Sequence, residues 1–193
     1  MSRLNQELKN MKRTLILDKA EEMFEEHGFE ELKVSDLAHE AGVSVGTIYA
    51  YFESKEGLFS ACVGVQIEAV YEVFMRLFEE ELPFEQLIER SQQIKFDMMS
   101  KKRKTLESGI INNPFFFESQ QISHKEGIDR IHRLFVDTID RHKKVDVDTL
   151  QLVYILNAIG NAYVLRWIEG EFDDLNAKTK EVSTLFISML KGA

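Results

Sequence analysis

The sequence predicts an all-α protein in which three short N-terminal helices are joined to a second part made of longer helices. Two observations carry this prediction. Only two prolines, Pro83 and Pro114, interrupt the 193 residues, and the ten glycines stand mostly singly where periodic segments end. Apolar residues recur at helical spacing through most of the chain. The content of 44% apolar and 30% charged residues is that of an ordinary globular protein.

The first helix is expected to start at Thr14. Ile16, Ala20 and Phe24 follow at helical spacing, and Gly28 ends the segment as a C-cap glycine. The residues before Thr14 form a basic arm, whose cationic side chains are Arg3, Lys9, Lys12 and Arg13.

Two short helices are predicted next, over residues 34–41 and 45–51. A fourth helix starts at Ser54, which is a suitable N-cap, and continues to Pro83. The chain is therefore expected to consist of two domains, residues 1–60 and residues 61–193.

The second domain is predicted to contain four further helices, over residues 83–104, 127–144, 146–172 and 176–192. The segment 108–121 looks like a break between helices, because Asn112-Asn113-Pro114 is turn chemistry. Apolar residues wrap all round the helix that starts at about Asp146, so it must be covered on every side. We therefore expect contact with a second copy of the chain. The interface candidates are Leu156, Ile159, Leu185 and Met189.

Several functions are unsupported by the composition. Cys62 is the only cysteine, so an intrachain disulfide and a Cys-based zinc site are excluded and a reducing, cytoplasmic compartment is expected. No apolar run approaches the roughly 18 to 20 residues of a membrane span, and the N-terminus lacks the apolar core of a signal peptide. The five histidines show no metal-ligand spacing, and no catalytic motif can be identified. We expect no metal, no cofactor, no membrane partner and no enzymatic activity.

Residues 34–52 have the pattern of a helix-turn-helix. Ala38 sits where the two helices must come closest, Gly42 permits the positive φ of the turn, and Leu37, Val43 and Ile48 supply the core behind them. The outward positions that remain carry hydroxyls and small side chains, without a charged residue between Ser44 and Phe52. They are Ser44, Gly46, Thr47, Tyr49 and Tyr51.

Such a helix suits the major groove of DNA, because small residues permit close approach and hydroxyls reach base edges or phosphate oxygens. Lys55, at the start of the next helix, adds a charge where backbone amides already favour an anion. The formal net charge of −9 argues against a nucleic-acid partner, whereas the basic arm favours one. The alternative interpretation is that Tyr49 and Tyr51 are half-buried packing residues.

The segment from Ile16 to Phe59 resembles the DNA-binding domain of TetR-family transcriptional regulators. The resemblance rests on Ala20, Phe24, Gly28-Phe29, Leu37-Ala38, Ala41-Gly42-Val43-Ser44, Gly46-Thr47-Ile48-Tyr49, Tyr51-Phe52 and Lys55-Glu56. It implies an N-terminal helix-turn-helix DNA-binding domain joined to a C-terminal helical ligand-binding and dimerisation domain. It also implies a homodimer in which the final two helices of each copy form a four-helix bundle.

The DNA-contacting residues expected on this basis include two departures from the family pattern. Leu32-Lys33 stands where the family often has a pair of Thr, so the charge of Lys33 is expected to replace a hydroxyl contact to phosphate. Val45 stands where the family often has a Lys, so one phosphate contact is either missing or exchanged for contact with a thymine methyl. The full set is Lys33, Ser35, Ser44, Val45, Gly46, Thr47, Tyr49, Tyr51 and Lys55.

The expected function is that of a repressor, which binds a palindromic double-stranded DNA operator as a homodimer and is released by a largely apolar small-molecule effector. The alternative is a helical ligand-binding or protein-interaction module that has lost DNA binding. Candidates for the effector site are Phe96, Met99, Phe115, Phe116, Asn157 and Asn161. The aromatic residues could equally be ordinary core, and the two asparagines could equally form hydrogen bonds across the dimer.

Overall fold

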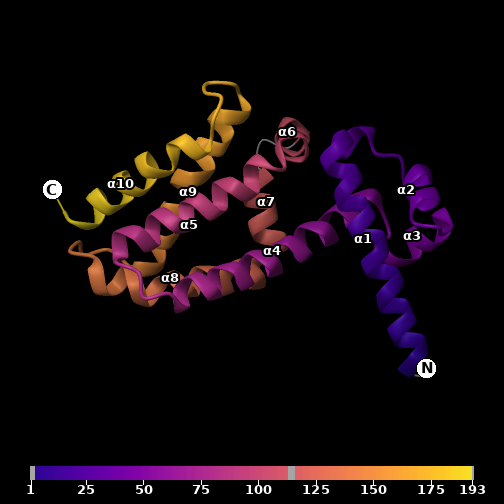
Figure 1. Ribbon diagram of the computed structural model, residues 1–193, viewed down its shortest axis with the longest axis horizontal. Coiled ribbons are helices and arrows are strands. Elements are labelled where there is room, and N and C mark those ends of the chain that lie inside the picture. The colour runs from indigo at the N-terminus through magenta and orange to yellow at the C-terminus, as the bar shows by residue number, and fades with distance from the viewer. Residues whose placement is uncertain (1–2, 113–115, 193) are drawn as a thin grey trace. The chain divides into compact units, whose positions relative to one another are not determined.

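The computed structural model describes residues 3–112 and 116–192, and these residues form ten α-helices and one short 3-10 helix, with no strand among them (Figure 1). The all-α prediction is therefore confirmed. The helices are α1 (Arg3–Glu31), α2 (Val34–Glu40), α3 (Val45–Phe52), α4 (Lys55–Glu79), α5 (Phe84–Ser100), α6 (Arg103–Asn112), α7 (Phe116–Ser123), α8 (Lys125–His142), α9 (Thr149–Ile168), η1 (Asn176–Lys178) and α10 (Thr179–Leu190).

The helices belong to two compact units. The N-terminal unit comprises Met1–Gln66 and Lys104–Phe116, and the C-terminal unit comprises Ile67–Arg103 and Phe117–Ala193. Helix α4 contributes its first half to one unit and its second half to the other. The expected division into domains at residue 60 stays a prediction.

Helix α1 begins at Arg3 and not at Thr14, so the described part of the basic arm is helical and continuous with the rest of α1. The first turns extend past α3 (Figure 1). Sequence periodicity does not reveal these turns, because Leu4 and Leu8 are exposed and no buried apolar stripe marks them. Good helix formers and an ion pair of 3.0 Å between Arg3 and Glu7, one turn apart, favour the helix.

The core of the N-terminal unit lies behind the helix-turn-helix. It joins α1, α2, α3 and the start of α4, and its buried residues include Phe24, Leu37, Ile48, Leu58 and Cys62. The glycines act as predicted at two turns. Gly42 has φ 62 between α2 and α3, and Gly28 has φ 79 and interrupts α1. The helix-turn-helix therefore has the predicted inside.

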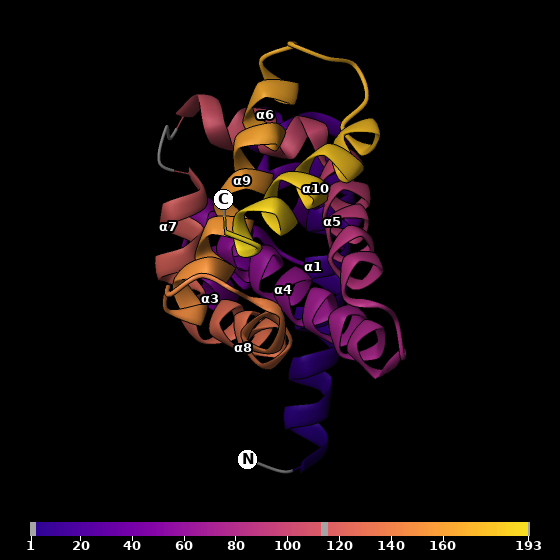
Figure 2. The same ribbon diagram turned by 90° about the vertical axis from the view of Figure 1, so that its left-hand side faces the viewer.

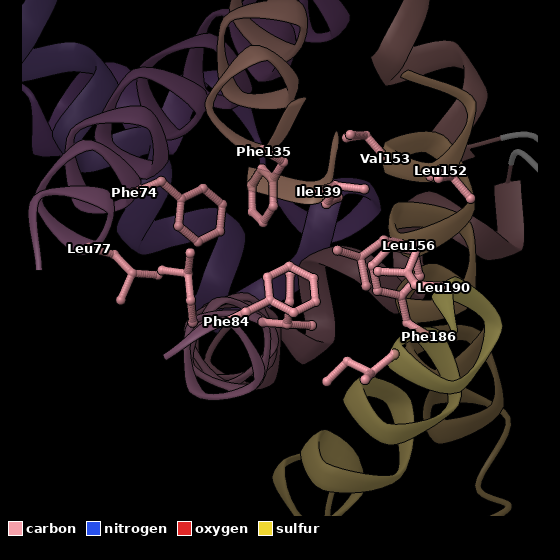
Figure 3. Packing of buried hydrophobic residues seen from close by; sticks show 13 residues of the cluster. Phe74, Leu77, Phe84, Phe135, Ile139, Leu152, Val153, Leu156, Phe186 and Leu190 are labelled. Carbon is pink, nitrogen blue, oxygen red and sulfur yellow. The ribbon is translucent and has the colours of Figure 1, made fainter. Parts of the chain in front are cut away.

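The core of the C-terminal unit is formed by side chains from α4, α5, α8, α9 and α10 that point into a shared interior (Figure 3). Phe74 and Leu77 come from α4, Phe135 and Ile139 from α8, and Phe186 from α10. Helix α10 packs along α5, and α8 packs along α9. Figure 2 shows α10 and α5 running side by side.

The expected break at residues 108–121 is wrong in part, because helices α6 and α7 occupy most of it. Gly109 lies inside α6, where a Cβ atom would come within 2.6 Å of the Phe116 ring. The glycine is thus used for close packing and does not mark a helix end. The turn at Asn113-Pro114 lies outside the described residues.

The expectation that no segment approaches the apolarity of a membrane span was too strong for α4. Its mean hydropathy reaches 1.4 over 18 residues, and by length and composition it could cross a membrane. One such helix is weak evidence for a membrane protein. Leu58 and Leu77 of α4 are buried in the cores of the two units. Apolar residues that pack into a core also raise the hydropathy of a helix.

Replacement of Ile48 tests the orientation of α3. Ile48 is fully buried, so Ile48→Ala should lower the free energy of unfolding by about 2 to 4 kcal/mol. Val45, on the same helix, is 39% exposed, and Val45→Ala should change it by less than about 0.5 kcal/mol. Urea denaturation followed by circular dichroism measures both. Equal losses would contradict the orientation of α3.

Candidate nucleic-acid interface

Ser44 fixes the start of α3. Its Oγ accepts a hydrogen bond of 3.1 Å from the backbone N–H of Thr47, and the two hydroxyls lie 2.8 Å apart in a second hydrogen bond. This N-cap satisfies one of the free amides of the first turn. The turn therefore presents two hydroxyls and the remaining free amides at a defined place.

The outward side of α3 carries no charge. Ser44, Val45, Gly46 and Tyr49 are all exposed, whereas Ile48 between them is buried. Tyr49 keeps 44% of its surface exposed, and it is the large polar side chain of this row. A flat, neutral surface with one phenol can approach a base-pair edge closely without displacing an ion pair.

Tyr51 is directed differently from Tyr49. Its hydroxyl donates a hydrogen bond of 3.2 Å to the backbone carbonyl of Lys9, and the Lys9 ammonium lies 5.8 Å from the centre of the Tyr51 ring. Arg13 lies over the Phe52 ring in the same way, at 5.4 Å. Tyr51 therefore connects the end of α3 to the first turns of α1, and it stands outside the exposed row.

The two lysines predicted to contact DNA differ in whether their ammonium groups already have protein partners. Lys55 donates a hydrogen bond of 3.0 Å to the carbonyl of Glu30 and lies 4.7 Å over the Phe29 ring, so its ammonium already has protein partners. Lys33 is exposed and forms no ion pair or side-chain hydrogen bond among the described residues. Ser35 is exposed and donates to the Asp36 carboxylate. Lys33, directly before α2, is therefore available to contact a phosphate.

The effector-site candidates are not one cluster in the structure. Phe96 is fully buried and Met99 is half-buried on α5, while Phe116 packs within the N-terminal unit against Phe59, with ring centres 6.4 Å apart. Phe115 lies outside the described residues.

Asn157 and Asn161 meet a residue that the sequence analysis missed. Each side-chain carbonyl accepts a hydrogen bond of 2.8 Å from the ammonium of Lys95, and the backbone carbonyl of Asn157 accepts a third at 3.1 Å. The two asparagines therefore act as a pair, as their spacing indicated. No signal in the sequence distinguishes Lys95 from the other lysines, since its partners come from α9, more than 60 positions later.

The four candidates for the dimer interface differ in burial. Leu185 and Met189 on α10 are 46% and 41% exposed. Leu156 is 3% exposed and belongs to the core of its own C-terminal unit, and Ile159 is half-buried against that core. A change at Leu156 would therefore disturb folding within one copy.

Among the residues that the structure describes, no group of three or more His, Cys, Asp or Glu side chains could hold a metal ion.

A serine-capped second helix, a glycine turn and a neutral exposed row define a helix-turn-helix of the DNA-binding class. Residues 16–62 match the family model described as bacterial regulatory proteins, tetR family. Residues 16–62 therefore form a DNA-binding region of the tetR family type, which confirms the resemblance seen in this part of the sequence.

Two curated relatives align with the same region. The HTH-type transcriptional repressor ComR of Escherichia coli is 41% identical over 56 residues, which are 29% of this chain and 27% of that protein. The fatty acid metabolism regulator protein of Bacillus subtilis is 43% identical over 61 residues, which are 30% of this chain and 31% of that protein. The alignments thus cover less than a third of the length of either relative.

A solved structure extends the likeness to both units. The transcriptional regulator FadR from Bacillus subtilis, in complex with stearoyl-CoA, has a TM-score of 0.72 at 19% identity, over 91% of this chain and 97% of that chain. At this identity the likeness establishes the fold. The C-terminal unit therefore shares its fold with the corresponding part of that regulator.

Removal of the N-cap tests the local design of α3. Ser44→Ala should destabilise the protein by about 1 kcal/mol, because the Thr47 amide loses its side-chain acceptor and keeps only its 2.9 Å bond to the Ser44 backbone carbonyl. Ser35→Ala is the matched control. It removes an exposed hydroxyl that caps no helix and should have a much smaller effect. Thermal denaturation measures both variants, and an equal shift in melting temperature would contradict the capping role of Ser44.

Proposed function

We propose that this protein is a ligand-responsive transcriptional repressor of the cytoplasm that binds a palindromic operator as a homodimer. The observation that carries the proposal is the exposed neutral row on α3, in which Tyr49 stands beside a preorganised N-terminal turn. The match of residues 16–62 to the tetR family supports it.

Operator binding is assigned to α3 in the major groove. The Tyr49 phenol and the Ser44 and Thr47 hydroxyls supply neutral hydrogen bonds, and Val45 offers a methyl-contacting surface. Lys33 supplies a phosphate contact, while Ser35 lies two residues further along the same exposed end of α2. Tyr51 and Lys55 act indirectly in this proposal, because they hold α3 and α4 to α1.

Dimerisation is assigned to the exposed faces of α9 and α10. Ala158, Ala162 and Leu165 follow one stripe of α9 at helical spacing, and Leu185 and Met189 follow one stripe of α10. Small residues on α9 permit close approach of a second helix. A second copy of the chain would cover both stripes, as expected for a four-helix bundle.

The effector is assigned to the C-terminal unit and is largely apolar. The FadR structure with stearoyl-CoA has the same fold, which supports an acyl-chain ligand. Helix α4 provides the coupling, because its residues lie in the cores of both units. A ligand that shifts the second half of α4 would move its first half and lower operator affinity.

Tyr49→Phe tests the contact with DNA. The variant should fold normally and bind a palindromic operator, selected from random duplexes, more weakly by about 1 to 2 kcal/mol per half-site, since a hydrogen bond to a charged acceptor is lost. Fluorescence anisotropy with labelled duplex measures the affinity.

Tyr51→Phe is the matched control for this experiment. It removes the same atom from the same helix, but its hydroxyl is bonded to Lys9. We expect a smaller change in operator affinity and faster amide exchange in the first turns of α1. A wild-type protein that selects no duplex would favour the alternative, a helical module that has lost DNA binding.

Leu185→Glu tests the dimer. The carboxylate would be buried without a partner between two copies, so sedimentation should show a monomer and operator binding should fall. Ile122→Glu, which replaces an exposed apolar residue of α7, should leave the dimer intact. A dimeric Leu185→Glu protein would contradict the assigned interface.

A further inference from the structure

The interior of the C-terminal unit contains a cluster of polar side chains centred on Lys95. Lys95 on α5 donates all three of its N–H bonds to α9, to oxygens of Asn157 and Asn161. A Cβ atom at Gly160, between the two asparagines, would lie 2.9 Å from Lys95 Nζ and 3.0 Å from Gln92 Oε1. Glycine at this position therefore lets α5 place two polar groups directly against α9.

The charge of Lys95 has no counter-ion. Its three acceptors are neutral amide oxygens, and no carboxylate lies within ion-pair distance of Nζ among the described residues. Burial lowers the pKa of Lys95 to about 7. Hydrogen bonds to neutral oxygens offset the cost of placing an ammonium away from water less than an adjacent anion with good hydrogen-bond geometry does.

Two further atoms of the unit's interior lack partners. Gln92 Oε1 and His132 Nδ1 are both buried without a hydrogen-bond partner among the described residues. The Lys95 charge contributes to lowering the pKa of His132, which places the His132 ring within electrostatic reach of Lys95. Buried polar atoms of this kind are normally satisfied. The cluster therefore has unused capacity for hydrogen bonding beside an uncompensated charge.

The cluster is only partly covered. Lys95, Asn157 and Asn161 are half-buried as whole residues, while the ammonium end of Lys95 is enclosed by protein. A ligand must therefore displace part of this cover to reach Nζ. Ile94 on α5 and Ile155 and Ile159 on α9 pack against the apolar core of the same unit. The helices that hold the polar cluster therefore also contribute apolar side chains to that core, and one cation close to an apolar core matches an amphipathic acid.

We propose that Lys95, held by Asn157 and Asn161, binds the carboxylate of a medium- or long-chain monocarboxylic acid that acts as the effector. This inference rests on the proposed function and adds the head group that the C-terminal unit recognises. The carboxylate acts as counter-ion to Nζ by replacing one of the three α9 oxygens as hydrogen-bond acceptor. An alcohol or a thioester of the same chain length has no negative charge at the first carbon of the chain.

Decanoate, 1-decanol and decanoyl-CoA test the head group with a constant chain. Isothermal titration at pH 6.5 should show decanoate binding at least tenfold more tightly than 1-decanol. At pH 8, above the lowered pKa of Lys95, binding of decanoate should be accompanied by proton uptake, because an adjacent anion raises that pKa again. Binding of 1-decanol should take up no proton. Burial lowers the pKa of His132 to about 4, so this ring stays neutral over the same range. Asp129 and Lys125 on α8, whose charges act on His132, have no contact with Nζ among the described residues.

Two variants remove the preference in different ways. Lys95→Met keeps an apolar stem and removes the charge. Asn161→Asp keeps Lys95 and places a carboxylate where the amide oxygen lies 2.8 Å from Nζ, so that the protein supplies its own counter-ion. Both variants should bind decanoate and 1-decanol within threefold of each other. Lys101→Met, an exposed change at the end of α5, should leave the tenfold preference intact.

Operator binding without ligand separates this inference from the proposed function. Circular dichroism should be near wild type in all three variants, which shows that they fold, and Lys101→Met should also bind the operator as the wild type does. Equal binding of decanoate and 1-decanol to the wild type, or a tenfold preference for decanoate that Lys95→Met leaves unchanged, would overturn the assignment of Lys95 while preserving an apolar effector. Any binding of decanoyl-CoA should be unaffected by Lys95→Met, and a loss of that binding would contradict recognition of a free carboxylate. Absence of binding by decanoate would overturn it as well. Failure of the wild type to bind any operator would instead overturn the proposed function.

Discussion

One helix has to satisfy two hydrophobic cores. Helix α4 buries Leu58 and Cys62 with the helix-turn-helix and Phe74 and Leu77 with the C-terminal helices, over 25 uninterrupted residues. A continuous helix cannot rotate at one end independently of the other without breaking backbone hydrogen bonds. The proposed coupling therefore assigns to α4 the transfer of packing changes from one core to the other. The apolar residues of α4 that are buried contribute to both cores, while only 17% of its most apolar 18-residue window is buried.

The surface of α3 that is proposed to face DNA carries no charged side chain. Residues 1–60 contain seven Lys or Arg and twelve Asp or Glu, a formal charge of −5, and two of the cations are already engaged in stacking on α3 aromatic rings. Affinity that depends on neutral hydrogen bonds and close fit is less sensitive to salt than affinity that depends on many phosphate contacts. Such a surface gains selectivity from shape, because a poor fit leaves polar groups unpaired.

The N-terminal fold could be predicted from the sequence because its signals are local. The positive φ of Gly42, the Ser44 cap and the burial of Leu37 and Ile48 all follow from residues within one short segment. The direction of Tyr51 could not be predicted, since its partner is a backbone carbonyl 42 positions earlier. The burial of Lys95 could not be predicted for the same reason. A buried lysine and a solvated lysine look alike in a sequence, and only the packing of α5 against α9 distinguishes them.

Cys62 lies in the N-terminal core, with its Sγ 3.8 Å from the carbonyl oxygen of Leu17 on α1. It is the single thiol in the chain, and it lies in the first half of α4, which belongs to the same unit as the helix-turn-helix. A thiol reagent can reach it only when α1 and α4 separate. The protein thus contains a native reporter, whose alkylation rate records how often this core opens and how a bound operator or ligand changes that frequency.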